Sequence, residues 1–197
     1  MTTRSAEIVR ETKETKVRVR VNLDGSGQSS IFTGIGFLDH MLTALATHSR
    51  IDIDLACEGD LVVDDHHTAE DTALALGQAI DQSLGGRSGI TRFASAYAPL
   101  DEALARVVVD LSGRPSPCID LGLRREMLGA IACENLTHFF ASFATAARMS
   151  LHADVLRGEN DHHKAEAAFK ALALALRQAV AIDPRSIGVP STKGTLS

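Results

Sequence analysis

Two copies of one histidine-rich motif are the clearest chemical feature of the sequence. The segment Asp65-His66-His67-Thr68-Ala69-Glu70 recurs as Asp161-His162-His163-Lys164-Ala165-Glu166, at an offset of 96 residues (162 − 66). A pair of lone histidines, His40 and His138, has almost the same offset, 98 residues (138 − 40). Imidazole nitrogens and carboxylate oxygens are good ligands for Mn²⁺, Fe²⁺, Co²⁺ or Zn²⁺. The matched spacing therefore indicates an internal duplication that carries metal ligands.

Helix geometry suggests how these residues could hold two ions. Residues at i, i+3 and i+4 share a helix face, so each glutamate can act beside either histidine of its motif. Adjacent histidines diverge by about 100° around the helix axis, so one ion cannot easily take both rings. We therefore expect two ions related by a pseudo-twofold axis, with open positions that favour Mn²⁺. The expected ligand sets are His40, His67, Glu70 and His162 for one ion, and His66, His138, His163 and Glu166 for the other.

The elements that must position these ligands are also duplicated. Period-two alternation predicts strands and 3.6-residue periodicity predicts helices. In the first half, strands are expected near 8–9 and over 17–21, 29–34 and 51–55, and helices over 36–48 and 66–84. In the second half, strands are expected over 94–98, 105–111, 116–123 and 150–156, and helices over 134–149 and 162–180. Asp24-Gly25 is a candidate hairpin turn between the second and third strands.

This order predicts an α+β fold made of two β-β-β-α-β-α half-repeats, 1–93 and 94–197. No linker rich in Pro, Gly or Ser separates the halves, so we expect them to form one fused domain. Amphipathic helices and half-buried sheets must each cover an apolar face. The economical packing places four helices between two four-stranded sheets, with the helix openings near the pseudo-twofold axis.

Composition excludes several classes of function. The 197 residues carry a net charge of −5, which argues against a nucleic-acid or acidic-membrane partner. No apolar run approaches the roughly 20 residues of a membrane span, and residues 1–16 contain no apolar signal segment. Cys57, Cys118 and Cys133 are too widely spaced for a zinc pair or a disulfide framework. We therefore expect a cytoplasmic protein.

Further polar residues are candidates for a site, each with an ordinary alternative. Glu14 could be a surface strand carboxylate, and Asp101-Glu102 could cap an element or support the metal ligands. Arg92 and Arg114 could be solvated charges or could bind a ligand. The segment 191–194, which includes Ser191 and Lys193, could be a flexible tail or could hold an anion.

A series of short segments carries a resemblance to a known family. In the first half these are residues 10–15, 33–42, 59–60, 64–71 and 89–93. In the second half they are residues 99–103, 110–115, 158–163, 169–171 and 190–194. Through these ordered segments the chain resembles imidazoleglycerol-phosphate dehydratase over nearly its whole length. Ala44 is a departure, because the family often has Gln there, so a polar substrate contact is missing or moved.

The resemblance implies a hydro-lyase of histidine biosynthesis that converts D-erythro-imidazoleglycerol phosphate to imidazoleacetol phosphate and water. It implies two Mn²⁺ per active site and a 24-subunit homo-oligomer built from trimers, in which subunits complete each other's sites. Glu14 would transfer protons, and Asp101 and Glu102 are expected to be further catalytic carboxylates. The substrate phosphate would be bound by Arg92, Arg114, Ser191 and Lys193.

The reaction explains why such a site would need metal. The hydrogen to be removed lies beside a hydroxyl carbon and is not activated by a carbonyl. A metal on a ring nitrogen would ease loss of the imidazole N–H proton, and the imidazolate-like ring could then expel the hydroxyl to give a diazafulvene. Two rival functions remain. A dimetal phosphohydrolase would release phosphate from the substrate, and in a non-catalytic metal-binding shell protein a mutation of Glu14 would have no effect.

Overall fold

Two four-stranded sheets with the same topology form the outer layers of the protein, whose computed structural model describes residues 4–196. The first sheet contains, in spatial order, β1 (Ser5–Glu11), β2 (Thr15–Asn22), β4 (Asp52–Gly59) and β3 (Ser29–Phe32). The second contains β5 (Phe93–Leu100), β6 (Ala103–Asp110), β10 (Ser150–Arg157) and β7 (Ser116–Asp120). In each sheet the last pair is parallel and the other pairs are antiparallel.

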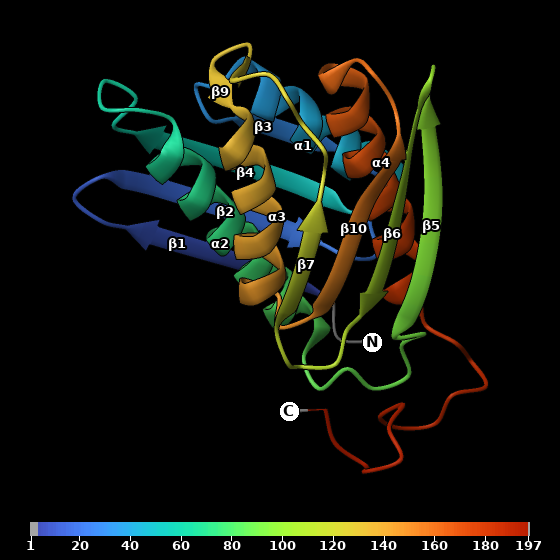
Figure 1. Ribbon diagram of the computed structural model, residues 1–197. Coiled ribbons are helices and arrows are strands. Elements are labelled where there is room, and N and C mark those ends of the chain that lie inside the picture. The colour runs from blue at the N-terminus through green and yellow to red at the C-terminus, as the bar shows by residue number, and fades with distance from the viewer. Residues whose placement is uncertain (1–3, 197) are drawn as a thin grey trace.

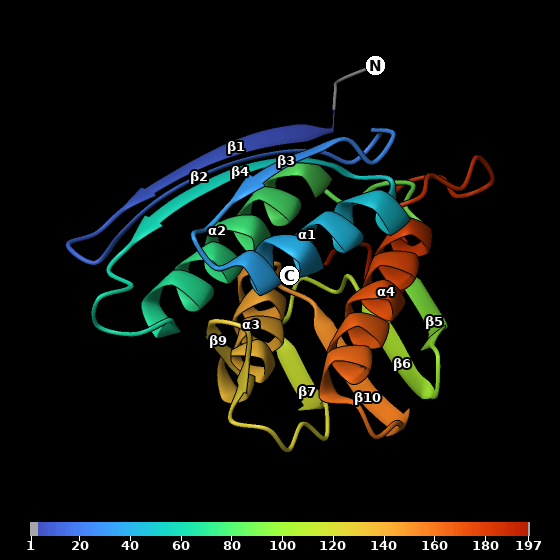
Figure 2. The same ribbon diagram turned by 90° about the horizontal axis from the view of Figure 1, so that it is seen from above.

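Four helices fill the space between the sheets (Figures 1 and 2). They are α1 (Gly36–Ser49), α2 (His66–Leu84), α3 (Cys133–Ala146) and α4 (Asp161–Ala179). The predicted α+β class, with two four-stranded sheets around four helices, is confirmed. A small hairpin of β8 (Met127–Leu128) and β9 (Ile131–Ala132) was not expected. Among the described helices, none has both the length and the apolar character that crossing a membrane would require.

The duplicated topology supports the division into half-repeats 1–93 and 94–197 as a proposal. The strands of the first sheet all precede β5, and β5 begins the second sheet. The proposed half-repeats begin at residue 1 and end at residue 197, and both of these residues lie outside the described range.

The predicted hairpin at Asp24-Gly25 is wrong, because β4 lies between β2 and β3. After β2 the chain therefore passes over the end of β4 to reach β3. The side chain of Asp52, at the start of β4, binds the backbone of this connecting segment. One carboxylate oxygen of Asp52 accepts backbone N–H bonds from Ser26, Gly27 and Gln28 at 2.8–2.9 Å. The β3–β4 pair is parallel and is joined through α1, as a parallel pair requires a crossover connection.

Close helix packing sets the distance between the chemically active residues. In β2, Val17, Val19 and Val21 are buried under the helices, as the alternating pattern predicts. On the helix layer, α2 packs against α3 at Gly77, where an added Cβ would lie 2.6 Å from the carbonyl oxygen of Phe143. The absence of a side chain at Gly77 thus lets two ligand-bearing helices approach closely.

Candidate metal centre

A polar side chain just before each histidine motif accepts a backbone N–H at the start of the helix. The Asp64 carboxylate accepts the backbone N–H of His66 at 2.8 Å, and the Asn160 side chain accepts that of His162 at 2.9 Å. Such side-chain acceptors satisfy amides that have no partner within the helix. The histidines are thereby placed in the first turns of α2 and α4, at the same end of the helix layer.

The first group of possible ligands, the α2–α3 cluster, consists of His66, Glu70 and His138. Each offers a ligand atom within 4.8 Å of the others. The Nε2 atom of His138 lies 2.9 Å from a carboxylate oxygen of Glu70, and the rings of His66 and His138 stack with centroids 4.9 Å apart. All three side chains are half-buried, so the cluster is accessible from solvent while two helices hold its geometry.

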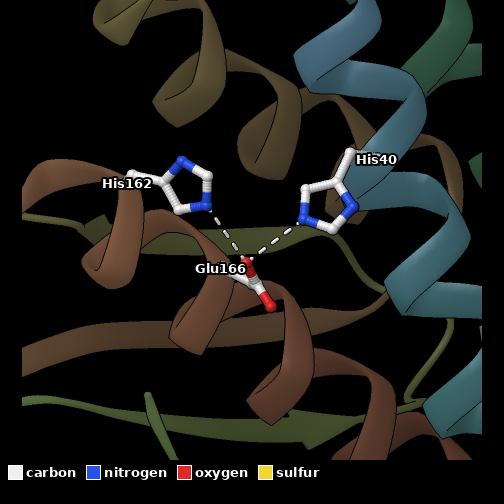
Figure 3. Close-up of side chains that lie close together, drawn as sticks. All are labelled: His40, His162 and Glu166. Carbon is white, nitrogen blue, oxygen red and sulfur yellow. Dashed lines mark hydrogen bonds and ion pairs between the residues drawn. The ribbon is translucent and has the colours of Figure 1, made fainter. Parts of the chain in front are cut away.

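The second group, the α1–α4 cluster, consists of His40, His162 and Glu166 (Figure 3). The Nε2 atoms of both histidines lie 3.2 Å from the same carboxylate oxygen of Glu166. The other oxygen of Glu166 lies 2.7 Å from the Lys170 ammonium. Burial opposes the charge of Glu166, but the bonds from Lys170 and His40 outweigh it, and the pKa of Glu166 is lowered.

Within one chain, the structure groups each glutamate with other histidines than the expected ligand sets did. Glu70 was expected beside His40 and His162, but the structure places Glu166 there. The cause is the packing of the helices, since α2 faces α3 and α4 faces α1. Sequence spacing showed that His66 and Glu70 share a helix face, but it did not show which helix that face meets.

His67 lies outside both clusters and is held by carboxylates. Its Nδ1 atom lies 3.0 Å from Asp60, and its Nε2 atom lies 3.8 Å from Glu14. The hydrogen bond to Asp60, strengthened by the charge of Glu14, raises the pKa of His67. Asp60 was not among the candidate residues. Its position directly after β4, at the sheet end that faces α2, is the signal that could have identified it.

His163 has the corresponding environment in the second half. Its Nδ1 atom lies 2.7 Å from Glu102, and its Nε2 atom lies 3.7 Å from Asp101. Backbone N–H bonds, the largest from Asn160, and the His163 bond lower the pKa of Glu102 to about 2. The bond to Glu102 in turn raises the pKa of His163. Glu102 thus holds both a ligand candidate and the loop before α4.

The candidate phosphate-binding residues lie at the other end of the second sheet. Arg92 precedes β5 and Asp101 follows it, so the length of this strand, about 25 Å, separates Arg92 from the histidine end. The Arg92 guanidinium donates to Asp110 at 2.7 and 3.1 Å and to the Pro190 carbonyl at 2.7 Å. The tail that carries Ser191 and Lys193 is therefore tied to Arg92, and Figure 1 shows it at this end. Arg114 and Lys193 are exposed.

Comparisons with known proteins give one consistent result. A family model described as imidazoleglycerol-phosphate dehydratase matches residues 33–176. A relative of that name from Acinetobacter baylyi is 52% identical over 197 residues, covering 100% of this chain and 98% of the relative. Another, from Phytophthora nicotianae, is 60% identical over 194 residues; the match covers 98% of this chain but only 43% of that longer protein.

Solved structures show the same fold. A crystal structure of imidazoleglycerol-phosphate dehydratase from Staphylococcus aureus matches with a TM-score of 0.82 and 35% identity, covering 91% of this chain and 99% of that one. The enzyme from Pyrococcus furiosus, solved in complex with (S)-C348, matches with a TM-score of 0.82 and 36% identity, covering 96% and 100%.

Proposed function

The chain belongs to the imidazoleglycerol-phosphate dehydratase family of hydro-lyases. On this basis we propose that it removes water from D-erythro-imidazoleglycerol phosphate to give imidazoleacetol phosphate, a step of histidine biosynthesis. The observation that carries this proposal is the pair of clusters with the same donor set, two imidazoles and one carboxylate each, on a chain that matches dehydratases along its length. The three thiols are free, which supports a reducing compartment such as the cytoplasm.

The donor set fits a divalent metal. The clusters offer nitrogen and oxygen ligands without thiolate, which suits Mn²⁺, and we propose that each cluster contributes to one of two Mn²⁺ sites. When bound, Mn²⁺ would act as a Lewis acid that makes the substrate imidazole more acidic and orients the hydroxyl groups. Three donors from one chain leave further coordination positions for other groups.

Neighbouring copies of the chain would complete these sites. His67 and His163 are 31% and 26% exposed and belong to neither cluster of their own chain. Each is bound to a carboxylate through Nδ1, which leaves Nε2 as the atom that could serve a second copy. Arg92 lies about a strand length from the clusters, farther than one small phosphate ester can reach. We therefore propose that the active site forms between subunits of a homo-oligomer, and the 24-subunit shell of the family is the expected assembly.

The side chains of this protein would bind the substrate and move its protons. Within the described residues, Arg92 uses three of its five N–H groups, which leaves two for the phosphate. Together with Arg114, Ser191 and Lys193 it would fix the phosphate end, and binding energy would thereby position the reacting carbons. Glu14 is 53% exposed beside His67, where its carboxylate could carry a proton between the substrate and water.

Turnover after metal removal tests the proposal. Protein stripped with EDTA should be inactive, and reloading with Mn²⁺ should restore formation of the ketone without release of phosphate. Release of phosphate from the substrate would instead identify a dimetal phosphohydrolase. Metal binding with neither product would identify a non-catalytic metal-binding shell protein.

A further inference from the structure

The two clusters have different surroundings at positions that the duplication makes equivalent. Alignment of α1 with α3 through His40 and His138 places Phe37 opposite Asn135 in the duplication. Alignment of α2 with α4 through their histidine motifs places Leu74 opposite Lys170. Each of these positions lies near one cluster, so the ligands are duplicated but the groups that support them are not.

Asn135 holds a ligand of the α2–α3 cluster in one orientation. It is 6% exposed, and its oxygen lies 2.9 Å from Nδ1 of His66. Its NH₂ group donates to Asp65 at 3.0 Å, and Asp65 also accepts the backbone N–H of Ala132 at 2.7 Å. Because a carboxylate only accepts hydrogen bonds, Asp65 fixes the Asn135 amide with its oxygen toward the ring. His66 then carries its proton on Nδ1 and keeps the Nε2 lone pair free for a metal.

Phe37 gives the α1–α4 cluster no equivalent hydrogen bond. Its ring meets that of His162 edge-on, with centroids 5.1 Å apart and an interplanar angle of 74°. An aromatic edge has no acceptor for an imidazole N–H. Among the described contacts, the His162 ring is therefore held by this packing and by the bond between its Nε2 and Glu166, and none gives its Nδ1 an acceptor like Asn135.

Lys170 places a positive charge beside the α1–α4 cluster. Its ammonium lies 2.7 Å from Glu166, and the two side chains are only 21% and 12% exposed. A cation at this distance offsets the negative charge that would attract a divalent ion, and partial burial limits solvent screening. At the equivalent position of α2 stands the apolar Leu74, and among the described salt bridges Glu70 is paired only with His138, not with a lysine.

We propose that the two metal sites are unequal, with the α2–α3 cluster binding its divalent ion at least about tenfold more tightly than the α1–α4 cluster. Asn135 is a positioning residue for the tighter site, and Lys170 weakens the other. Half-loaded protein therefore carries its ion at the α2–α3 cluster. This inference rests on the proposed function in one respect, that both clusters bind metal.

A titration of the stripped full-length protein with Mn²⁺, with free Mn²⁺ measured by electron paramagnetic resonance, tests the inequality. The wild-type protein should show two affinity classes. His138→Ala should remove the tighter class and His40→Ala the weaker one. Lys170→Met should tighten the weaker class at least about tenfold, and Lys170→Arg, which keeps the charge, should restore the wild-type value. Asn135→Leu should weaken the tighter class by about 10- to 100-fold.

Controls separate this inference from a general effect on the fold and from the proposed function. Arg177→Met removes an exposed charge from the same helix as Lys170 and should leave both classes unchanged. The inference would be overturned if the wild type showed a single class of equivalent Mn²⁺ sites. It would also be overturned if folded Lys170→Met protein kept the wild-type Mn²⁺ affinity of the weaker class. Two classes without turnover of the substrate would support the inference and contradict only the proposed dehydratase activity.

Discussion

The Nδ1 atom of His163 lies 2.7 Å from a carboxylate oxygen of Glu102, at the turn between β5 and β6. The same carboxylate accepts the backbone N–H groups of Glu159 and Asn160 at 3.1 and 2.9 Å. One side chain at this turn thus fixes both the ring of a ligand candidate and the loop that leads into α4. In the first half, a carboxylate oxygen of Asp60 lies 3.0 Å from Nδ1 of His67. Asp60 occupies a different position in the fold from Glu102, because it directly follows β4.

Glu102→Ala should therefore weaken Mn²⁺ binding by about 10- to 100-fold, because carboxylates behind a ligating histidine orient its ring. Isothermal titration calorimetry of the stripped protein measures this directly. Glu159→Ala is the matched control, since it removes an exposed neighbouring carboxylate and keeps the backbone N–H that Glu102 accepts. Equal Mn²⁺ affinity of the Glu102→Ala variant and the wild type would show that Glu102 does not orient His163 for metal binding.

Glu14→Gln should lower kcat by about 100-fold or more while metal content stays at the wild-type level, because the amide cannot carry the proton. Glu14 is exposed and lies 3.8 Å from His67, so the change removes a charge without opening a cavity. Steady-state kinetics and metal analysis of the same preparation provide the measurement. Glu11→Gln, an exposed carboxylate of β1, serves as the control. Wild-type turnover by Glu14→Gln would exclude the proton-transfer role.

Asp52→Ala should destabilise the protein by about 1–3 kcal/mol near pH 7, because three backbone N–H groups of residues 26–28 lose their acceptor. Burial alone would raise the pKa of Asp52, but these bonds outweigh it and lower the pKa below the ordinary 3.8. A lowered pKa stabilises the folded state above pH 3.8, and this contribution is lost as pH falls through the folded value.

Denaturant unfolding from pH 7 to pH 3 checks both points. The difference in unfolding free energy between wild type and Asp52→Ala should be constant at neutral pH and should shrink below about pH 4. Asp54→Ala changes an exposed carboxylate of the same strand and should show a smaller effect. A difference that grows on acidification would contradict the assigned direction of the pKa shift.

Gly77→Ala should destabilise the protein by about 1–3 kcal/mol, because the added methyl would lie 2.6 Å from the Phe143 carbonyl oxygen and would push α2 from α3. Since His66 and His138 lie on these two helices, Mn²⁺ affinity at the α2–α3 cluster should fall as well. Thermal unfolding and the Mn²⁺ titration measure the two effects. Gly36→Ala is the control, because no atom of residues 4–196 lies within 4 Å of its added Cβ. A fully stable Gly77→Ala would show that the helix contact is adaptable.

Much of the architecture and the inventory of ligand candidates followed from local patterns. The offsets between the histidine motifs revealed the duplication, and periodicity located all four helices and the eight strands of the two sheets. These features are readable because a strand or helix repeats its apolar face every two or 3.6 residues, whatever it packs against. The order of the strands was less accessible: the pattern suggested a hairpin after Asp24, yet β4 enters between β2 and β3.

The tertiary structure alone decided which ligands meet. Glu70 lies beside His138 and Glu166 beside His40 because α2 packs on α3 and α4 on α1. The spacing of residues along the sequence does not show which two helices pack together. It also placed Arg92 beside Asp110 at the sheet end remote from the histidines. Local periodicity fixes which residues share a face of one element. The contact between two faces depends on the shapes of residues distant in the chain, as at Gly77 and Phe143, and so it emerges only when the chain is folded.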